Sequence, residues 1–294
     1  MGGPGTPHEA FMVAEVVRFL VEDAPRSGTV VDMTVGAGGH AEALLRAGAE
    51  RVIGVDRDPE ALAVAAERLA GFGARYRAVQ TTFDEVDAGV TLGPVEGVLF
   101  DLGVSSMQLD RPERGFSYRA DGPLDMRMAG AADDEPSAAD LVNTLPERDL
   151  ADLIYVNGGE HRSRRIARAI VRRRPITGTD QLAGVIVGAV GRRPGGPHPA
   201  RRTFQALRIA VNREIEELAA SLPQAAGLLA PGGRMVVIAY HSLEDRIVKT
   251  TFRDDDRLTA LTKKPLRPSE EEIAHNPRAR SAIFRAAARV ELAA

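Results

Sequence analysis

The sequence predicts an α/β fold in which a parallel sheet is interrupted by an inserted helical segment. Short β-branched apolar runs alternate with Ala-rich helical patterns through roughly the first hundred residues, as in consecutive βαβ units. This alternation stops after residue 102, and a strand pattern returns at residues 234–240. The chain has 294 residues, 44% hydrophobic and 27% charged, so it is long enough to bury a large core.

The first part of the chain carries the clearest strand and helix signals. Pro59 follows Asp58 at a favourable first-turn position, which marks the start of a helix. We expect strands at residues 29–33, 51–55, 76–80 and 97–102, and helices at residues 40–47 and 59–69.

The middle of the chain reads as an insertion. A Gly, Ser, Asp and Pro-rich loop runs to about residue 136. Helical patterns follow at residues 138–143, 147–156, 163–173 and 179–190, and then as one long helix at residues 203–221. We therefore expect one domain formed by residues 1–106 and 214–294, and an inserted, mainly helical domain at residues 107–213.

The last part of the chain returns to the sheet. The strand at residues 234–240 precedes two further strands, at residues 258–262 and 281–290, which we expect to form an antiparallel hairpin at the sheet edge.

Composition excludes several classes of function. The chain has no cysteine, so disulfides, thiolate metal sites and cysteine nucleophiles are ruled out. Its six histidines lack metal-ligand spacing, and we expect no catalytic metal. Met1–Thr6 reads as an unstructured lead-in without signal-peptide character, and no apolar run reaches membrane-spanning length. We expect a cytoplasmic protein.

Positive charge gathers in the insertion. Residues 151–213 contain thirteen arginines and three acidic residues, although the whole chain carries a net charge of -3. Arg164, Arg168 and Arg172 recur at every fourth position on one predicted helix, opposite Ile166 and Ile170. This stripe can meet RNA phosphates, or it can be an ordinary solvated helix face.

A glycine-rich turn follows the first predicted strand. Residues 30–40 read Val-Val-Asp-Met-Thr-Val-Gly-Ala-Gly-Gly-His, where glycines let a ligand approach backbone N–H groups at a helix start. Asp56, twenty residues beyond Gly36, ends the next strand, where it can accept hydrogen bonds from two ribose hydroxyls. The pair indicates a nucleotide-like ligand.

The identity of that ligand stays open from these residues alone. Gly36, Gly38 and Ala41 also satisfy the dinucleotide pattern, so an NAD(P)-dependent oxidoreductase is an alternative. Against it, the chain shows no convincing second mononucleotide-binding half. A non-catalytic RNA-binding protein with a vestigial cofactor fold is a third alternative, and the intact glycines and Asp56 argue against it.

Longer motifs identify a family. The chain resembles the MraW family of bacterial small-subunit ribosomal RNA methyltransferases over nearly its whole length. The resemblance rests on residues 8–9, 38–40, 101–106, 108–110, 114–117, 121–128, 203–209, 240–246 and 276–281.

The resemblance implies a Rossmann-like class I methyltransferase sheet with an inserted helical domain that helps hold RNA. It implies methyl transfer from S-adenosyl-L-methionine to N4 of a decoding-centre cytosine in 16S rRNA, in the small ribosomal subunit, and suggests a homodimer. The cofactor contacts that it implies are Gly38, Gly39, His40, Asp56, Phe83, Asp101 and Gln108.

The chemistry of the reaction suggests roles for three residues. Cytosine N4 is a poor nucleophile because its lone pair is delocalised into the ring, so the protein must orient the amine and accept its hydrogen bonds. Asp101 is our candidate catalytic acceptor, and the alternative is that it only contacts the cofactor. Tyr240 and His241 are further candidates for the base pocket. They can instead simply begin a helix, with Ser242 as its N-cap and Asp245 three residues on.

Overall fold

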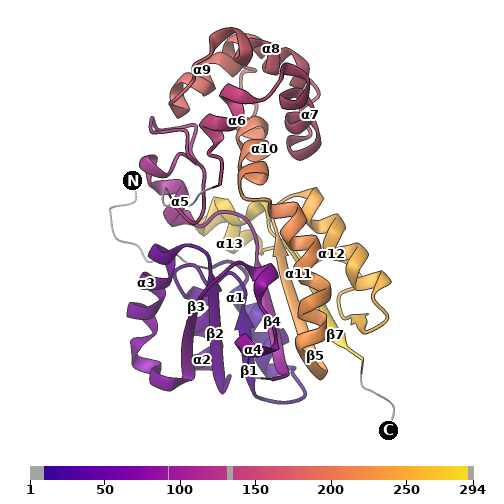
Figure 1. The fold of residues 1–294 in the computed structure, drawn as a ribbon. Coiled ribbons are helices and arrows are strands. Elements are labelled where there is room, and N and C mark those ends of the chain that lie inside the picture. Colours follow the sequence, from indigo (N-terminus) through magenta and orange to yellow (C-terminus); the bar gives the residue numbers. More distant parts are fainter. Residues whose placement is uncertain (1–9, 92, 131–134, 291–294) are drawn as a thin grey trace. The chain divides into compact units, whose positions relative to one another are not determined.

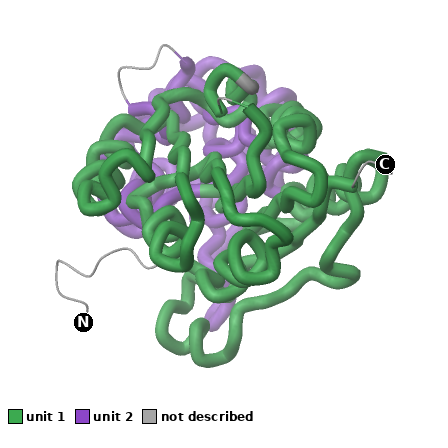
Figure 2. The backbone as a smooth tube through the Cα atoms, turned by 90° about the horizontal axis from the view of Figure 1, so that it is seen from below, with its two compact units in different colours: residues 1–103, 215–294 green, residues 104–214 purple. Residues whose placement is uncertain are grey.

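The computed structural model describes residues 10–91, 93–130 and 135–290. Figure 2 shows its two compact units. The sheet unit comprises Met1–Gly103 and Ile215–Ala294, and the helical unit comprises Val104–Glu214. The chain thus divides at 103/104 and 214/215, where the sequence suggested 106/107 and 213/214. The expected lead-in, Met1–Thr6, lies outside the described residues.

The described part of the sheet unit contains a seven-stranded sheet in the order β3-β2-β1-β4-β5-β7-β6 (Figure 1). Strands β1 to β5 run parallel to their neighbours among themselves, whereas β7 is antiparallel to both β5 and β6. This topology confirms the predicted α/β, Rossmann-like fold class. The strands are β1 (Thr29–Asp32), β2 (Arg51–Asp56), β3 (Tyr76–Gln80), β4 (Val95–Asp101), β5 (Leu229–Ala239), β6 (Leu258–Ala260) and β7 (Ile283–Arg289).

Both faces of the sheet are covered, which explains why β1, β2 and β4 have buried residues at consecutive rather than alternate positions. Val30 and Leu99 belong to a buried cluster with residues of α1, α2 and α3. Their neighbours Val31 and Val98 belong to a second cluster with residues of α11 and α12. These helices are α1 (Val13–Val17), α2 (Gly39–Ala47), α3 (Pro59–Leu69), α11 (Glu214–Leu228) and α12 (Ser242–Asp254).

The last two strands pair as expected but are not joined as a tight hairpin. β6 is the outermost strand and pairs antiparallel with β7. Helix α13 (Glu270–His275) and the 3-10 helix η5 (Pro277–Ser281) lie between them in the chain. The other short elements of this unit are the π-helix η1 (Arg18–Glu22), the 3-10 helices η2 (Ala70–Arg75) and η3 (Phe83–Glu85), and α4 (Ala88–Thr91).

The helical unit has a core of its own. Leu150 and Ile154 of α7 pack in one buried cluster with Ile166 and Ile170 of α8 and Phe204 of α10. The four-residue spacing within α7 and within α8 places each pair on one helix face. Its elements are α5 (Ser106–Asp110), the 3-10 helix η4 (Pro112–Arg114), α6 (Ala138–Thr144), α7 (Glu147–Gly158), α8 (Ser163–Arg173), α9 (Thr179–Val190) and α10 (Arg201–Val211).

The segment expected to be a loop up to residue 136 contains helix α5. Ser105 Oγ accepts the N–H of Gln108, and Gln108 Oε1 accepts the N–H of Ser105, each at 3.2 Å. This reciprocal capping box stabilises the start of α5. The Gly, Ser, Asp and Pro-rich composition of the segment had predicted only a loop.

The single long helix predicted over residues 203–221 is wrong. The chain forms α10 and α11 instead, separated by Asn212 and by Arg213, which has a φ of 49°. The Asn212 side chain donates to Met126 O and accepts the Met128 N–H, each at 2.8 Å. Asn212 therefore ties the end of α10 to the chain at residues 126–128, and the left-handed Arg213 ends the helix.

Of the helices in the described ranges, none combines the length and the apolar character needed to cross a membrane.

Candidate active site

Four strands of the sheet end at the same edge with polar residues. Asp32 ends β1, Asp56 ends β2, Asp101 ends β4, and Tyr240 directly follows β5. The chain winds outward from β1 through β2 and β3, then in the opposite direction through β4 and β5, so the order reverses beside β1. In open α/β sheets, ligands bind at the carboxyl ends of the strands at this reversal.

The predicted glycine turn joins β1 to α2 at this edge. Gly38 is the N-cap of α2 and has a φ of 79°, a conformation that favours glycine. A Cβ atom at Gly39 would lie 3.0 Å from the Cβ of Ala10. The glycines thus allow a tight turn that starts a helix, whose first N–H groups have no intrahelical partner and favour a polar or anionic ligand group.

The structure brings Asp56 and the glycine turn together. Asp56 Oδ2 accepts the N–H of Gly36 and Oδ1 accepts the N–H of Asp58, both at 2.9 Å. Burial raises the pKa of Asp56 to about 6, although these two hydrogen bonds oppose the shift. Each carboxylate oxygen can accept a further hydrogen bond, so Asp56 can still receive the hydroxyls of a ribose.

Asp101 lies between two side chains from other elements. Tyr240 donates its hydroxyl to Asp101 Oδ1 at 2.7 Å. His40 Nε2, at the start of α2, lies 3.4 Å from Asp101 Oδ2, an ion-pair contact rather than an aligned hydrogen bond. Burial lowers the pKa of His40, but its interaction with the nearby Asp101 carboxylate, and then with that of Asp32, outweighs this and raises the pKa overall. His40 and Asp101 were each predicted as cofactor contacts, and the structure brings them side by side. Their role toward the cofactor stays a prediction.

Asp32 is a site residue that the sequence reasoning missed. Its side chain is fully buried, and Oδ1 accepts the Thr34 N–H at 3.2 Å, whereas Oδ2 has no hydrogen-bond partner within the described part of the chain. Burial is the main reason that its pKa rises to about 7. The available signal was a single acidic residue in an otherwise apolar strand directly before the glycine turn.

These residues fit the nucleoside cofactor S-adenosylmethionine. Oδ2 of Asp32 and both ring nitrogens of His40 are buried without a hydrogen-bond partner among the described residues, next to the glycine turn. Buried polar atoms are normally paired, so unpaired ones at a strand-end site indicate a missing ligand. Asp56 supplies acceptors for a ribose, and the acidic side chains suit a ligand that carries positive charge.

Phe83 and Gln108 stay predicted as cofactor contacts. Phe83, in η3, is partly buried and packs edge-on against Phe100 of β4, with ring centroids 5.9 Å apart. The packing against Phe100 gives the Phe83 ring a structural role in the sheet unit. Contact between this ring and the adenine of the cofactor stays a prediction. Gln108 belongs to the helical unit, where it forms the capping box with Ser105.

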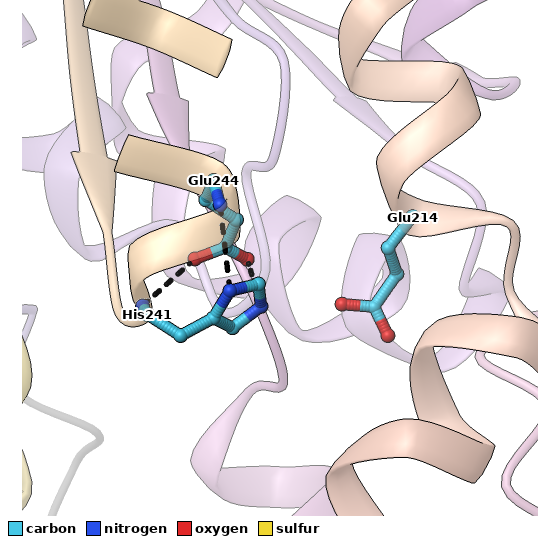
Figure 3. A group of neighbouring side chains, drawn as sticks. All are labelled: Glu214, His241 and Glu244. Atoms are coloured by element: carbon cyan, nitrogen blue, oxygen red, sulfur yellow. Dashed lines mark hydrogen bonds and ion pairs between the residues drawn. The ribbon is translucent and has the colours of Figure 1, made fainter. Parts of the chain in front are cut away.

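His241 is the N-cap of α12, so the prediction that Ser242 takes this position is wrong. His241 Nδ1 accepts the Glu244 N–H at 3.4 Å, and Glu244 Oε2 accepts the His241 N–H at 3.2 Å (Figure 3). Glu244 Oε2 also accepts the N–H of Tyr240 at 2.7 Å. Glu214, also drawn in Figure 3, belongs to the helical unit, where it pairs with Arg208 at 2.8 Å. The capping contacts give His241 a structural role, and its place in the base pocket stays a prediction.

Comparisons with known proteins identify the family of the chain. The chain is 51% identical to the ribosomal RNA small subunit methyltransferase H of Methylobacterium sp. (strain 4-46), over 98% of this chain and 92% of that protein. Identity to the protein of the same name from Synechococcus sp. (strain JA-3-3Ab) is 50%, over 96% and 94%. A solved rRNA methylase from Streptococcus thermophilus is 12% identical, with a TM-score of 0.47 over 99% of this chain and 100% of that one. A profile of the MraW methylase family matches residues 5–290, and the chain therefore belongs to that family.

Proposed function

We propose that this S-adenosylmethionine-dependent methyltransferase methylates N4 of a cytosine in the decoding centre of 16S rRNA. The main support for this substrate is sequence identity: about half of the positions, along almost the whole chain, are identical to those of proteins named small-subunit rRNA methyltransferases. Membership of a methylase family argues against the oxidoreductase and the non-catalytic RNA-binding alternatives.

The site offers the acceptor that this reaction needs. The bound cofactor supplies an electrophilic methyl group, and the cytosine amine must be turned so that its nitrogen meets that group. Asp101 can accept a hydrogen bond from the amine, which directs the nitrogen lone pair and stabilises the positive charge that develops on it. Its side chain is 22% exposed, whereas that of its neighbour His40 is 5% exposed, so Asp101 is the more accessible of the two.

The helical unit supplies a surface for RNA. On α8, Ile166 and Ile170 are fully buried, and Arg164, Arg168 and Arg172 are exposed, which agrees with a helix that packs on one face and presents arginines on the other. Arg168 lies 3.3 Å from Glu147, but a pair this exposed contributes little and can be exchanged for a phosphate. The target base must leave its stack before it can enter a pocket.

The remaining parts of the proposal concern the setting of the reaction. We place the protein in the cytoplasm, acting on the small ribosomal subunit, and expect a homodimer from the family resemblance. Light scattering on the purified protein measures its mass directly, and a monomer at micromolar concentration would remove the dimer from the proposal.

The test is incorporation of labelled methyl groups from S-adenosylmethionine. Small subunits that lack the modification and free 16S rRNA are offered separately, with transfer RNA as a control substrate. Incorporation into either of the first two, and not into transfer RNA, supports the proposal and identifies the preferred substrate. Measured cofactor binding without incorporation into either would leave the fold assignment intact and refute the substrate.

A further inference from the structure

Tyr240 is held at a fixed position beside Asp101 by contacts that do not involve a substrate. Its N–H donates to Glu244 Oε2 at 2.7 Å, and Glu244 also caps α12, so the backbone of Tyr240 is tied to the start of that helix. Its ring packs edge-on against Phe11, with centroids 6.1 Å apart. With backbone and ring both restrained, the hydroxyl has little freedom to move.

Asp101 is correspondingly restrained at three points. Its N–H donates to Thr34 Oγ1 at 2.7 Å, Oδ1 accepts the Tyr240 hydroxyl at 2.7 Å, and Oδ2 faces His40. These contacts come from the segment after β1, the segment after β5 and the start of α2, so they limit both the backbone and the side-chain rotation of Asp101. One acceptor position on each oxygen is left for a ligand, since a carboxylate oxygen can accept two hydrogen bonds.

We infer that Tyr240 is a positioning residue for methyl transfer: its hydroxyl holds the Asp101 carboxylate in the orientation that receives the target amine. This inference rests on the proposed function, in which Asp101 is that acceptor. A hydrogen bond to a charged carboxylate at 2.7 Å is of the strong, charge-assisted kind. Burial first, and then Asp101, raise the pKa of Tyr240 well above its usual value, so the phenol stays a donor throughout the neutral range.

The variant Tyr240→Phe removes the hydroxyl and keeps the ring. Because the lost hydrogen bond is to a charged group, we expect a fall of roughly 10- to 100-fold in the single-turnover rate of methyl transfer, equivalent to about 1.4–2.7 kcal/mol. We expect the dissociation constant for S-adenosylmethionine, measured by calorimetry, to change less than about threefold. Tyr155→Phe is the matched control, because Tyr155 lies on α7 of the helical unit and is 53% exposed.

A double-mutant cycle tests whether Tyr240 acts through Asp101. In an Asp101→Asn background, adding Tyr240→Phe is expected to cost less than about twofold in rate, because the orientation of the carboxylate no longer matters. Two rate losses that multiply would show that Tyr240 acts independently and overturn the inference. So would a Tyr240→Phe variant that transfers methyl at the wild-type rate, or one that loses cofactor binding in proportion to its rate.

Wild-type protein that methylates no RNA would refute the proposed function, and with it this inference. Transfer by the wild type with no effect of Tyr240→Phe refutes the inference alone.

Discussion

The buried carboxyl group of Asp32 predicts an unusual pH dependence of stability in the absence of cofactor. Its side chain is fully buried, and burial raises its pKa from 3.8 to about 7. A shift of this size is equivalent to about 4 kcal/mol at most, since one pKa unit corresponds to about 1.4 kcal/mol. The variant Asp32→Asn keeps the size of the side chain and removes its ionisation.

The sign of the effect follows from the direction of the shift. Below pH 3.8 the carboxyl group is protonated in both the folded and the unfolded chain, and it causes no pH-dependent penalty. As the pH rises from 4 to 7, the unfolded chain loses this proton while the folded chain keeps it, so the wild type loses stability relative to Asp32→Asn. Above about pH 7 the full penalty is present.

The assay is urea denaturation followed by far-ultraviolet circular dichroism, because the chain contains no tryptophan. The stability advantage of Asp32→Asn is expected to grow by roughly 2 to 3 kcal/mol between pH 5 and pH 8. Asp140→Asn is a control of opposite sign, since the hydrogen bonds from Ser137 lower the pKa of Asp140. That variant loses stability relative to the wild type near neutral pH, and the difference closes as the pH falls below 4. An Asp32→Asn advantage that stays constant from pH 5 to pH 8 would refute the account of this buried carboxyl group.

Further predictions concern the helical unit. Replacing Arg164 and Arg172 together by alanine should weaken RNA binding and lower the slope of log affinity against log salt by about 1.5, whereas Arg46→Ala in the sheet unit should change neither. Salt titrations of RNA binding measure this, and an unchanged slope would exclude the α8 stripe. Gly158→Ala should cost roughly 1–3 kcal/mol of unfolding free energy, because its Cβ would lie 2.4 Å from a carbonyl oxygen of α10. Gly188→Ala, with nothing within 4 Å, should stabilise by about 0.5–1 kcal/mol, and equal effects of the two variants in urea denaturation would contradict this packing.

The sequence predicted the strands, the glycine turn and the position of Asp56, because each of these depends on residues close together in the chain. Strands β1, β2 and β5 contain runs of valine and isoleucine, and such runs can be recognised in the sequence because both faces of a parallel sheet are buried. The glycine turn and Asp56 were predicted together from their spacing, and the hydrogen bond from Gly36 to Asp56 joins them in the structure.

Contacts between distant segments were not predictable in the same way. Tyr240 and Asp101 are 139 positions apart, and nothing in either local sequence indicates their hydrogen bond. Asp32 gives no periodic signal, since a single acid in a strand has a role only through the residues that the fold brings around it. The break between α10 and α11 depends on the Asn212 side chain binding the backbone of Met126 and Met128, more than eighty positions earlier.

The most direct test of the central claim is the identity of the nucleoside that receives the methyl group. Small subunits lacking the modification are incubated with the protein and labelled S-adenosylmethionine, and the labelled nucleoside and its position in 16S rRNA are determined by mass spectrometry. We predict N4-methylcytidine at one position of the decoding centre. A labelled nucleoside of another kind, or label spread over many positions, would contradict the assignment.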